Sequence, residues 1–317
     1  MTGVTFTLKK VTMKDIASRA NVSIATVSYV LNNVDNQTIP EATRSLILQI
    51  AEELHYIPNL TARSLAKKKT GLVGILINKT PAMPYWKRQS YFSFVDGLEE
   101  RLTAAGYHTL LFSLDAMNPS LDIIVERKLE AVFLIDVRDE VFYSISSHFV
   151  EGVPLILIDS LIEDKLFKQI VFDYHAALQL AVAEDSSKVC LIMENYNNSS
   201  LVSYILEGLD ISKDAIFIIN DRSELDALAK KNSFKRAIVI NEFIGSYLEK
   251  LKIFTSLTVL CTCNAPEILI RKKTKKITFE DKSTDAFRLM QDLLKNVDYS
   301  AEDPNRYYIG INFINPV

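Results

Sequence analysis

The sequence predicts a small all-α head followed by an α/β body of two lobes. Three observations support this fold class. Residues Val11–Ala66 carry short helical patterns with a tight turn between the first two, short apolar runs alternate with amphipathic helices from Gly71 onward, and the alternation comes in two series. Near-continuous apolar strands between helices are typical of parallel sheets covered on both faces, so two series predict two doubly wound subdomains.

The first two helices of the head are predicted from their caps. Thr12 and Asp15 form a capping box, in which each residue can satisfy a backbone N–H near the other. Asn21 tolerates the left-handed conformation that ends a helix. Ser23 is a favourable N-cap for a second helix, which we expect over Ile24–Asn32.

The faces of these helices predict a helix-turn-helix. On the second helix, the residues expected to face the core are Val27, Val30 and Leu31. Those expected to face outward are Ile24, Ala25, Ser28 and Tyr29. A third helix is expected from Pro40, with an apolar face of Leu46, Ile47, Ile50 and Leu54. A second helix with an exposed polar face after a tight turn is how such proteins read a DNA major groove.

The head resembles the LacI/GalR family of bacterial transcription regulators. The matching motifs are DIASRANVSIATVSYVLN, EATR, HYIPN and ARSLA. The resemblance implies a lambda-repressor-like head and a body like the periplasmic sugar-binding proteins. The resemblance implies that base edges are contacted by Ile24, Ala25 and Tyr29. It implies that phosphates are contacted by Thr12, Ser23, Thr26, Ser28 and Asn32. Ile24 and Ala25 offer only apolar contacts, and Tyr29 cannot bind guanine in a bidentate manner, so the operator sequence stays open.

The resemblance also implies a hinge helix that pairs across a dimer and enters the minor groove. Its expected contacts come from Asn59, Ala62, Arg63 and Leu65. Leu65 would wedge into a base step and kink the duplex. We therefore expect a DNA-binding domain over 10–58, a hinge and linker over 59–69, and an effector-binding and dimerisation domain over 70–317.

Composition supports a DNA contact at one end of the chain. Residues 1–70 hold nine Lys and Arg against five Asp and Glu, a net +4, which leaves −7 for the remainder of a chain of net charge −3. No signal peptide or membrane-spanning run is visible. The three cysteines, expected as buried strand thiols, favour a reducing cytoplasm. No metal or cofactor site is expected.

In the body, the first series predicts strands at Leu72–Ile77, Tyr107–Phe112, Ala131–Ile135, Pro154–Asp159 and Gln169–Phe172, with a helix at Phe92–Ala105. The second predicts strands at Lys188–Met193, Ala215–Ile219, Ala237–Ile240 and Leu257–Cys261, with helices at Ala176–Ala183, Leu201–Gly208 and Glu242–Leu251. The resemblance implies that Tyr307–Ile314 is the last strand. The resemblance implies three crossings between lobes, which gives lobe one about 71–170 and 277–298, and lobe two about 171–276 and 299–317.

Ligands of open α/β sheets bind beyond the carboxyl ends of the strands. That rule selects as effector-pocket candidates Tyr85, Trp86, Asp159, Asn195, Asn241, Glu242, Cys263 and Asn264. The Arg and Asp by which the family holds sugars are missing at the matching positions. Two interpretations remain open: a pocket for something other than a simple sugar, with Tyr85 and Trp86 as stacking groups, or a degenerate pocket with control by a protein partner or by abundance.

The sequence therefore predicts a DNA-binding transcriptional regulator, most simply a repressor. It would bind a near-palindromic operator as a homodimer, under control of a small-molecule effector such as a sugar or its derivative, or of a corepressor. The alternative is a DNA-binding protein with a degenerate pocket, controlled by a protein partner or acting architecturally. An enzyme is not expected, because the chain has no GxSxG elbow, Walker A loop or GxGxxG after a strand.

Overall fold

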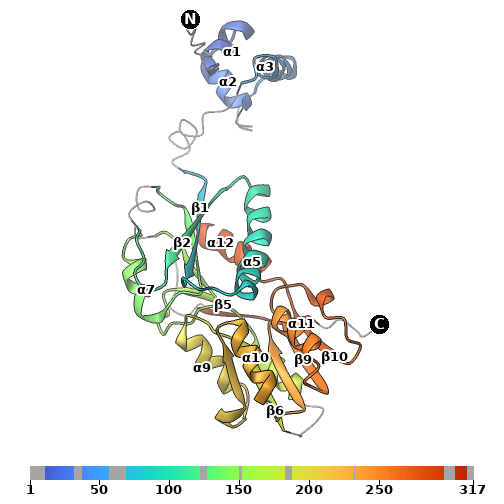
Figure 1. Cartoon of the computed structure of the whole chain (residues 1–317). Helices are drawn as coiled ribbons and strands as arrows, with labels where there is room; N and C mark the ends of the chain where they lie inside the picture. The colour runs from blue at the N-terminus through green and yellow to red at the C-terminus, as the bar shows by residue number, and fades with distance from the viewer. Residues whose placement is uncertain are drawn as a thin grey trace, which may run out of the picture. The chain divides into compact units, whose positions relative to one another are not determined.

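The head is a three-helix unit built as its caps predict. The computed structural model describes residues 11–31, 38–56, 69–121, 127–149, 152–182, 188–231, 233–295 and 304–312. Helices α1 (Met13–Ala20), α2 (Ile24–Leu31) and α3 (Glu41–Glu53) form the described part of this unit (Figure 1). The Thr12 N–H donates to the Asp15 carboxylate at 2.8 Å, Asn21 ends α1 with φ 52°, and the Thr26 N–H donates to Ser23 Oγ at 3.0 Å.

A small apolar core joins the three helices. Its buried members are Ile16, Ala17, Ala20, Val27, Val30, Ile47 and Ile50. Leu31 and Leu54 pack against it only partly buried, and Leu46 is 44% exposed, so the prediction of Leu46 as a core residue was wrong. Ile47 and Ile50 already fill the space facing the other helices, and Leu46 lies one position off their stripe.

The body, Thr70–Val317, is a second compact unit with two six-stranded sheets. The sheet of lobe one has the order β11-β5-β4-β3-β1-β2 and is parallel throughout. Its strands are β1 (Leu72–Lys79), β2 (His108–Asp115), β3 (Ala131–Ile135), β4 (Leu155–Ile158), β5 (Lys168–Phe172) and β11 (Arg306–Ile309). Strands β3, β4 and β5 are buried along their whole length, as expected for the centre of a covered sheet.

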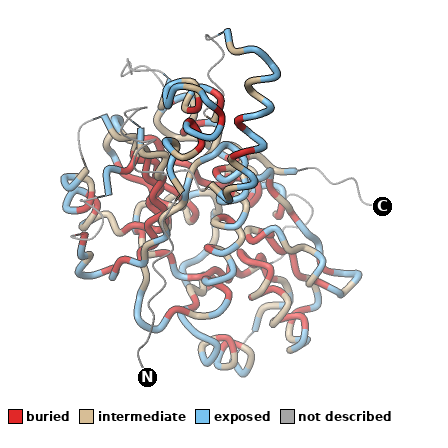
Figure 2. Tube along the Cα trace, turned by 90° about the horizontal axis from the view of Figure 1, so that it is seen from above, coloured by how far each residue is buried: buried red, intermediate tan, exposed pale blue. Residues whose placement is uncertain are grey.

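The sheet of lobe two has the order β12-β10-β9-β8-β6-β7, with β12 antiparallel to β10. Its strands are β6 (Val189–Glu194), β7 (Ile216–Ile219), β8 (Arg236–Ile240), β9 (Ser256–Cys261), β10 (Thr274–Phe279) and β12 (Ile311–Asn312). The helices of the body are α5 (Tyr85–Ala104), α7 (Asp139–Ser146), α8 (Tyr174–Val182), α9 (Ser199–Glu207), α10 (Arg222–Lys231), α11 (Glu242–Leu251) and α12 (Lys282–Lys295). Figure 2 shows the buried residues gathered in the interior of the body, with the exposed residues toward its outside.

The division between lobes differs from the prediction in three places. Strand β5 stays in lobe one through Phe172, β10 stays in lobe two through Phe279, and β11 returns to lobe one before β12 enters lobe two. The expected last strand, Tyr307–Ile314, is therefore two short strands in different sheets, with Gly310 between them. Apolar pattern marks a strand but not the sheet that it joins, so the sequence could not place these crossings.

Helix α5 also begins earlier than expected. We predicted a loop up to Tyr91, whereas the helix starts at Tyr85 behind Pro84. Trp86, Lys87 and Tyr91 are all buried in it. The spacing of these three buried residues is helical. The sequence does not show this burial pattern, because a lysine is not expected to be buried unless it is paired. The extra turns carry α5 into the seam between the lobes (Figure 1).

Candidate functional site

The outward face of α2 presents the residues predicted to read bases. Ile24 is 49% exposed, Tyr29 is 37% exposed and Ala25 is exposed. The three side chains are therefore accessible on the face of α2 that the sequence predicts to contact bases.

The residues predicted to contact phosphate lie around that face. Thr12 and Ser23 are exposed, and Thr26 and Ser28 are partly exposed. The Ser23 and Thr26 hydroxyls lie 2.8 Å apart at the start of α2, where backbone N–H groups and the helix dipole favour anions. Asn32 and the four hinge residues Asn59, Ala62, Arg63 and Leu65 lie outside the described residues.

In the body, polar residues follow the strands at the edge where the two lobes meet. Asp136 follows β3, Asp159 follows β4 and Asn241 follows β8, and all three have left-handed backbone angles, with φ of 51°, 49° and 88°. Such angles are uncommon outside glycine, and Asp and Asn tolerate them best. They turn the chain sharply, and the three side chains bond within the body.

The seam is held by an ion pair from the first turn of α5. Lys87 Nζ lies 2.6 Å from Asp136 Oδ2 and also donates to the backbone carbonyl of Asn195. Lys87 is 5% exposed and Asp136 is fully buried. Burial raises the pKa of Asp136, although the neighbouring Lys87 ammonium opposes that rise. One lysine thus connects lobe one to the end of β6 in lobe two.

A second set of contacts surrounds Glu194, the last residue of β6. Its Oε1 accepts from the Ser90 hydroxyl at 3.1 Å and from the Asn241 amide at 3.1 Å. The Asn241 amide also lies 3.1 Å from Ser90 Oγ. Burial raises the pKa of Glu194, with Lys87 acting in the opposite direction. The carboxyl ends of β6 and β8 therefore bond to the side chains of α5.

The segment between β6 and α9 docks onto lobe one. The Asn197 N–H donates to Asp136 at 2.8 Å, and its side-chain amide donates to the carbonyl of Asn78 at 3.0 Å. Asp139, at the start of α7, accepts from the hydroxyls of Ser199 at 2.6 Å and Ser200 at 2.9 Å. Polar groups that satisfy one another across two lobes favour one relative arrangement of the lobes.

Several predicted effector residues are already bonded within the protein. Trp86 is 1% exposed and lies in the apolar cluster of lobe two. The Glu242 carboxylate accepts from the backbone N–H groups of Cys263 and Ala265, at 3.0 and 2.8 Å. Asp159 pairs with Lys282 at 2.5 Å. With Asn241 committed to Ser90 and Glu194, these groups are held by other parts of the protein rather than exposed in an open cavity.

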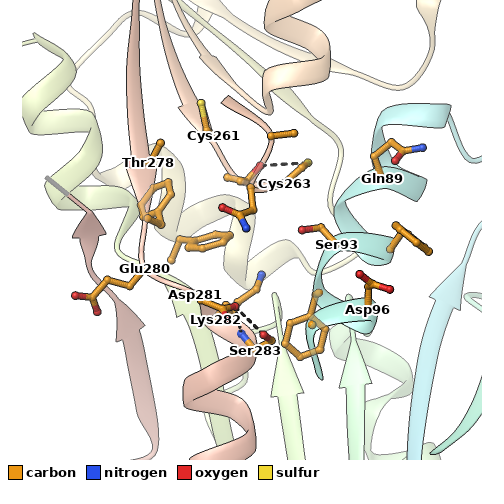
Figure 3. Close-up of a pocket in the computed structure, with 18 of the residues that line it drawn as sticks. Gln89, Ser93, Asp96, Cys261, Cys263, Thr278, Glu280, Asp281, Lys282 and Ser283 are labelled. Carbon is orange, nitrogen blue, oxygen red and sulfur yellow. Dashed lines mark hydrogen bonds between the residues drawn. The ribbon is translucent and has the colours of Figure 1, made fainter. Parts of the chain in front are cut away.

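The remaining candidates divide between two cavities. Cys263 and Asn264 line a pocket of about 480 Å³ between α5, the loop after β9 and the start of α12. Figure 3 shows Gln89, Ser93 and Asp96 on one side of it, Cys263 and Thr278 above, and Lys282 and Ser283 below. Asn195 lines a separate cavity of about 420 Å³ beside Lys87. Tyr85 is 47% exposed at the helix start and contacts Trp86 edge-on.

The cysteines are free and buried, and Cys190 and Cys261 lie in strands as predicted, whereas Cys263 lies in the bend after β9. Burial raises the pKa of Cys263 well above the ordinary thiol range, with the Glu242 carboxylate adding to the effect. A protonated, buried thiol is a poor nucleophile. Cys263 therefore contributes shape and a weak hydrogen bond, at 3.1 Å from Ser90 Oγ, to the wall of the pocket. Within the described ranges, no cluster of three or more His, Cys, Asp or Glu residues could hold a metal ion.

Sequence reasoning missed the residues that close the seam: Lys87, Ser90, Asp136, Asp139, Glu194 and Asn197. Asp136 and Glu194 could have been found, because each stands at the carboxyl end of an apolar strand. Lys87 carried a weaker signal, a helical spacing of four to Tyr91 that became visible only once the helix start was known.

Residues 12–59 match the family model described as bacterial regulatory proteins, lacI family. The head of the chain is therefore a LacI-family DNA-binding domain. The sucrose operon repressor of Lactococcus lactis subsp. lactis is 26% identical over 271 residues, 82% of this chain and 77% of that protein. The HTH-type transcriptional regulator RegA of Clostridium saccharobutylicum is 37% identical over 144 residues, 45% of this chain but only 40% of that protein.

The fold likeness extends beyond the LacI-family head. A crystal structure of the Lac repressor dimer bound to operator and the anti-inducer ONPF has a TM-score of 0.69, covering 96% of this chain and 97% of that one at 15% identity. The expected head and two-lobed body are therefore confirmed. These relatives are transcriptional regulators by name, and this chain is a DNA-binding regulator of the LacI type. No helix among the described residues is long and apolar enough to cross a membrane.

Proposed function

We propose that this LacI-family chain is a cytoplasmic repressor that binds a near-palindromic operator as a homodimer. The observation that carries the proposal is the exposed face of α2, where Ile24, Ala25 and Tyr29 stand clear of a capped, well-packed helix-turn-helix. One head reads only half a site, so two-fold symmetry gives the second half. The likeness to a repressor described as an operator-bound dimer supports the same assembly. A corepressor protein is not part of the proposal.

The test is selection of bound sites from a random duplex pool by the full-length protein at fixed salt. A palindrome with two half-sites supports the proposal. Binding without any recovered motif, fading as salt rises, contradicts sequence-specific repression and favours an architectural role. Leu65→Ala is the informative variant, because a wedge that supports only the kinked complex affects specific binding more than non-specific binding.

We further propose that the pocket of about 480 Å³ receives the effector. Gln89, Ser93 and Asn264 supply amide and hydroxyl groups, and phenylalanine rings form its apolar walls: Phe92, Phe172, Phe243 and Phe279. Charged side chains also line the pocket, among them Asp96, Arg101 and Lys282. This mixture of polar groups and aromatic rings supports a small polar molecule with an apolar face, such as a sugar derivative.

Calorimetric titration of a metabolite panel tests the pocket. Asn264→Ala is expected to weaken the binding of a hit about tenfold, as loss of one hydrogen bond does. Asn220→Ala, in the other cavity, is the matched control. Equal loss in both variants contradicts the assignment of the pocket.

A second candidate is a regulator whose body takes no small molecule. One observation favours it: the polar groups at the strand ends, including Glu242, Asn241 and Asp159, bond to the protein itself. Operator affinity that is unchanged by every metabolite in the panel supports this candidate. The same result contradicts control of DNA binding by an effector in the pocket of about 480 Å³.

A further inference from the structure

The surroundings of Lys87 Nζ have the composition of a cation site. Asp136 Oδ2 lies at 2.6 Å, and the carbonyl oxygen of Asn195 accepts a hydrogen bond. The ring centroids of Tyr196 and Tyr91 lie 5.5 and 5.9 Å from the nitrogen, within the range of cation–π attraction. A carboxylate, a carbonyl and two aromatic faces together match a primary ammonium group.

These groups come from both lobes. Asp136 follows β3 and Tyr91 lies on α5, next to the sheet of lobe one, whereas Asn195 and Tyr196 follow β6 of lobe two. The site is therefore complete only while the lobes are together. An ammonium bound there contacts both lobes at once, as a ligand of a two-lobed protein does.

The site is strongly desolvated. Asp136 and Glu194 are 0% and 1% exposed, and Tyr91 and Tyr196 are 6% and 8% exposed. Glu194 Oε2 has no hydrogen-bond partner among the described residues. Two buried carboxyl groups next to a single ammonium need that positive charge, because an uncompensated charge in such surroundings is strongly unfavourable.

We propose that the seam between the lobes is a binding site for a primary ammonium group, and that Lys87 is its resident occupant. The side chain takes the position that a small molecule would take, so the body holds its closed arrangement by itself. Lobe closure through Lys87 can be tested without DNA bound to the head and without an effector in the pocket of about 480 Å³.

The neighbouring residue supplies a probe. Trp86 is the only tryptophan in the chain. It projects from α5, yet it packs in the core cluster whose other buried members come from residues 190–269 of lobe two. Its emission and its access to acrylamide in the full-length protein therefore report directly whether the seam is closed.

The first measurement uses the wild-type protein without ligand. We expect blue-shifted emission and little quenching by acrylamide. Emission and quenching like those of free tryptophan would overturn the proposal, because the seam would then be open without a ligand.

The second measurement uses Lys87→Ala, which lacks the atoms of a propylammonium ion beyond Cβ. Loss of one partner of a buried ion pair is expected to shift the closed-to-open equilibrium on the order of a hundredfold, seen as increased quenching. Added n-propylammonium is expected to restore protection, whereas sodium chloride at the same ionic strength is not. The cavity lined by Lys87, Thr80 and Asn195 offers an entry path.

Two further variants keep the result decisive. Arg88→Ala removes a charge from the next, exposed residue and should leave quenching unchanged. Lys87→Met fills the space without a charge, so it should increase quenching and not respond to propylammonium. If Lys87→Ala stays protected, or if propylammonium has no effect beyond that of salt, the ammonium site is refuted. If Lys87→Ala is unfolded, propylammonium should restore the circular dichroism of the folded protein. Failure to restore it refutes the ammonium site.

Discussion

Glu194, at the end of β6, is one of the buried carboxyl groups that contribute to the pH response of the body. Glu194 is 1% exposed, and its pKa is raised mainly by burial. A carboxyl group with a raised pKa in the folded state binds its proton more tightly there than in the unfolded chain. The free energy of unfolding therefore decreases as pH rises from the unfolded glutamate pKa through the raised folded value.

Glu194→Gln is expected to remove that dependence. The amide oxygen can still accept from Ser90 and Asn241, but no charge has to be buried at high pH. The advantage of the variant over wild type should increase with pH, by at most about 1.4 kcal/mol per unit, and then level off. Urea unfolding at several pH values measures it, with Glu207→Gln on the exposed side of α9 as the control. A pH-independent difference would contradict the buried, proton-binding role.

The single hydroxyl group of Tyr29 determines which base edges this side chain can hydrogen-bond. Tyr29→Phe should relax the preference at one operator base pair and weaken binding by about 1 kcal/mol. Repeating the site selection with this variant measures the effect. Tyr143→Phe, an exposed tyrosine of the body, is the control. If the selected site is unchanged, Tyr29 does not contact a base.

At the scale of elements, α5 shows what a sequence can and cannot reveal. The head helices were predictable, because caps and faces are local: Thr12, Asn21 and Ser23 each act within a few residues. The first turns of α5 were not, because Lys87 is compatible with burial only through Asp136, which lies far along the chain. Glu194 is a different case, because it stands at the carboxyl end of the apolar strand β6 and could have been found from that position.

The contact of α5 with α12 rests on a glycine. A Cβ at Gly97 would lie 2.7 Å from Ser283 Oγ and 3.3 Å from Ser283 Cβ. Gly97→Ala should lower the free energy of unfolding by about 1–3 kcal/mol through overpacking, although alanine favours the helix by up to about 1 kcal/mol. The double variant with Ser283→Gly should recover most of that loss. Chemical denaturation of the two single variants and the double variant gives the coupling, and additive effects would show that the helices do not meet there.

At the scale of the whole molecule, the two units are expected to behave as separate domains. A protein starting at Thr70 should fold with the circular dichroism of an α/β body, because its sheets and cores contain no residue of the head. It should also sediment as a dimer at micromolar concentration, if the body holds the interface. A monomeric body would place dimerisation in the head and hinge instead.

The order of the strands also bears on how the protein is made. Helices α1 to α3 are contiguous, so the head can fold while synthesis continues. The body cannot, because β11 joins lobe one and β12 joins lobe two only after residue 305, when the other ten strands have already been translated. Until then β5 and β10 are the edge strands of their sheets, and the edge of β5, which is buried in the finished body, stays exposed. Exposed apolar edges favour aggregation. We expect newly made chains to depend on chaperones during that interval, and a nascent regulator to acquire its DNA-reading surface well before the part that controls it.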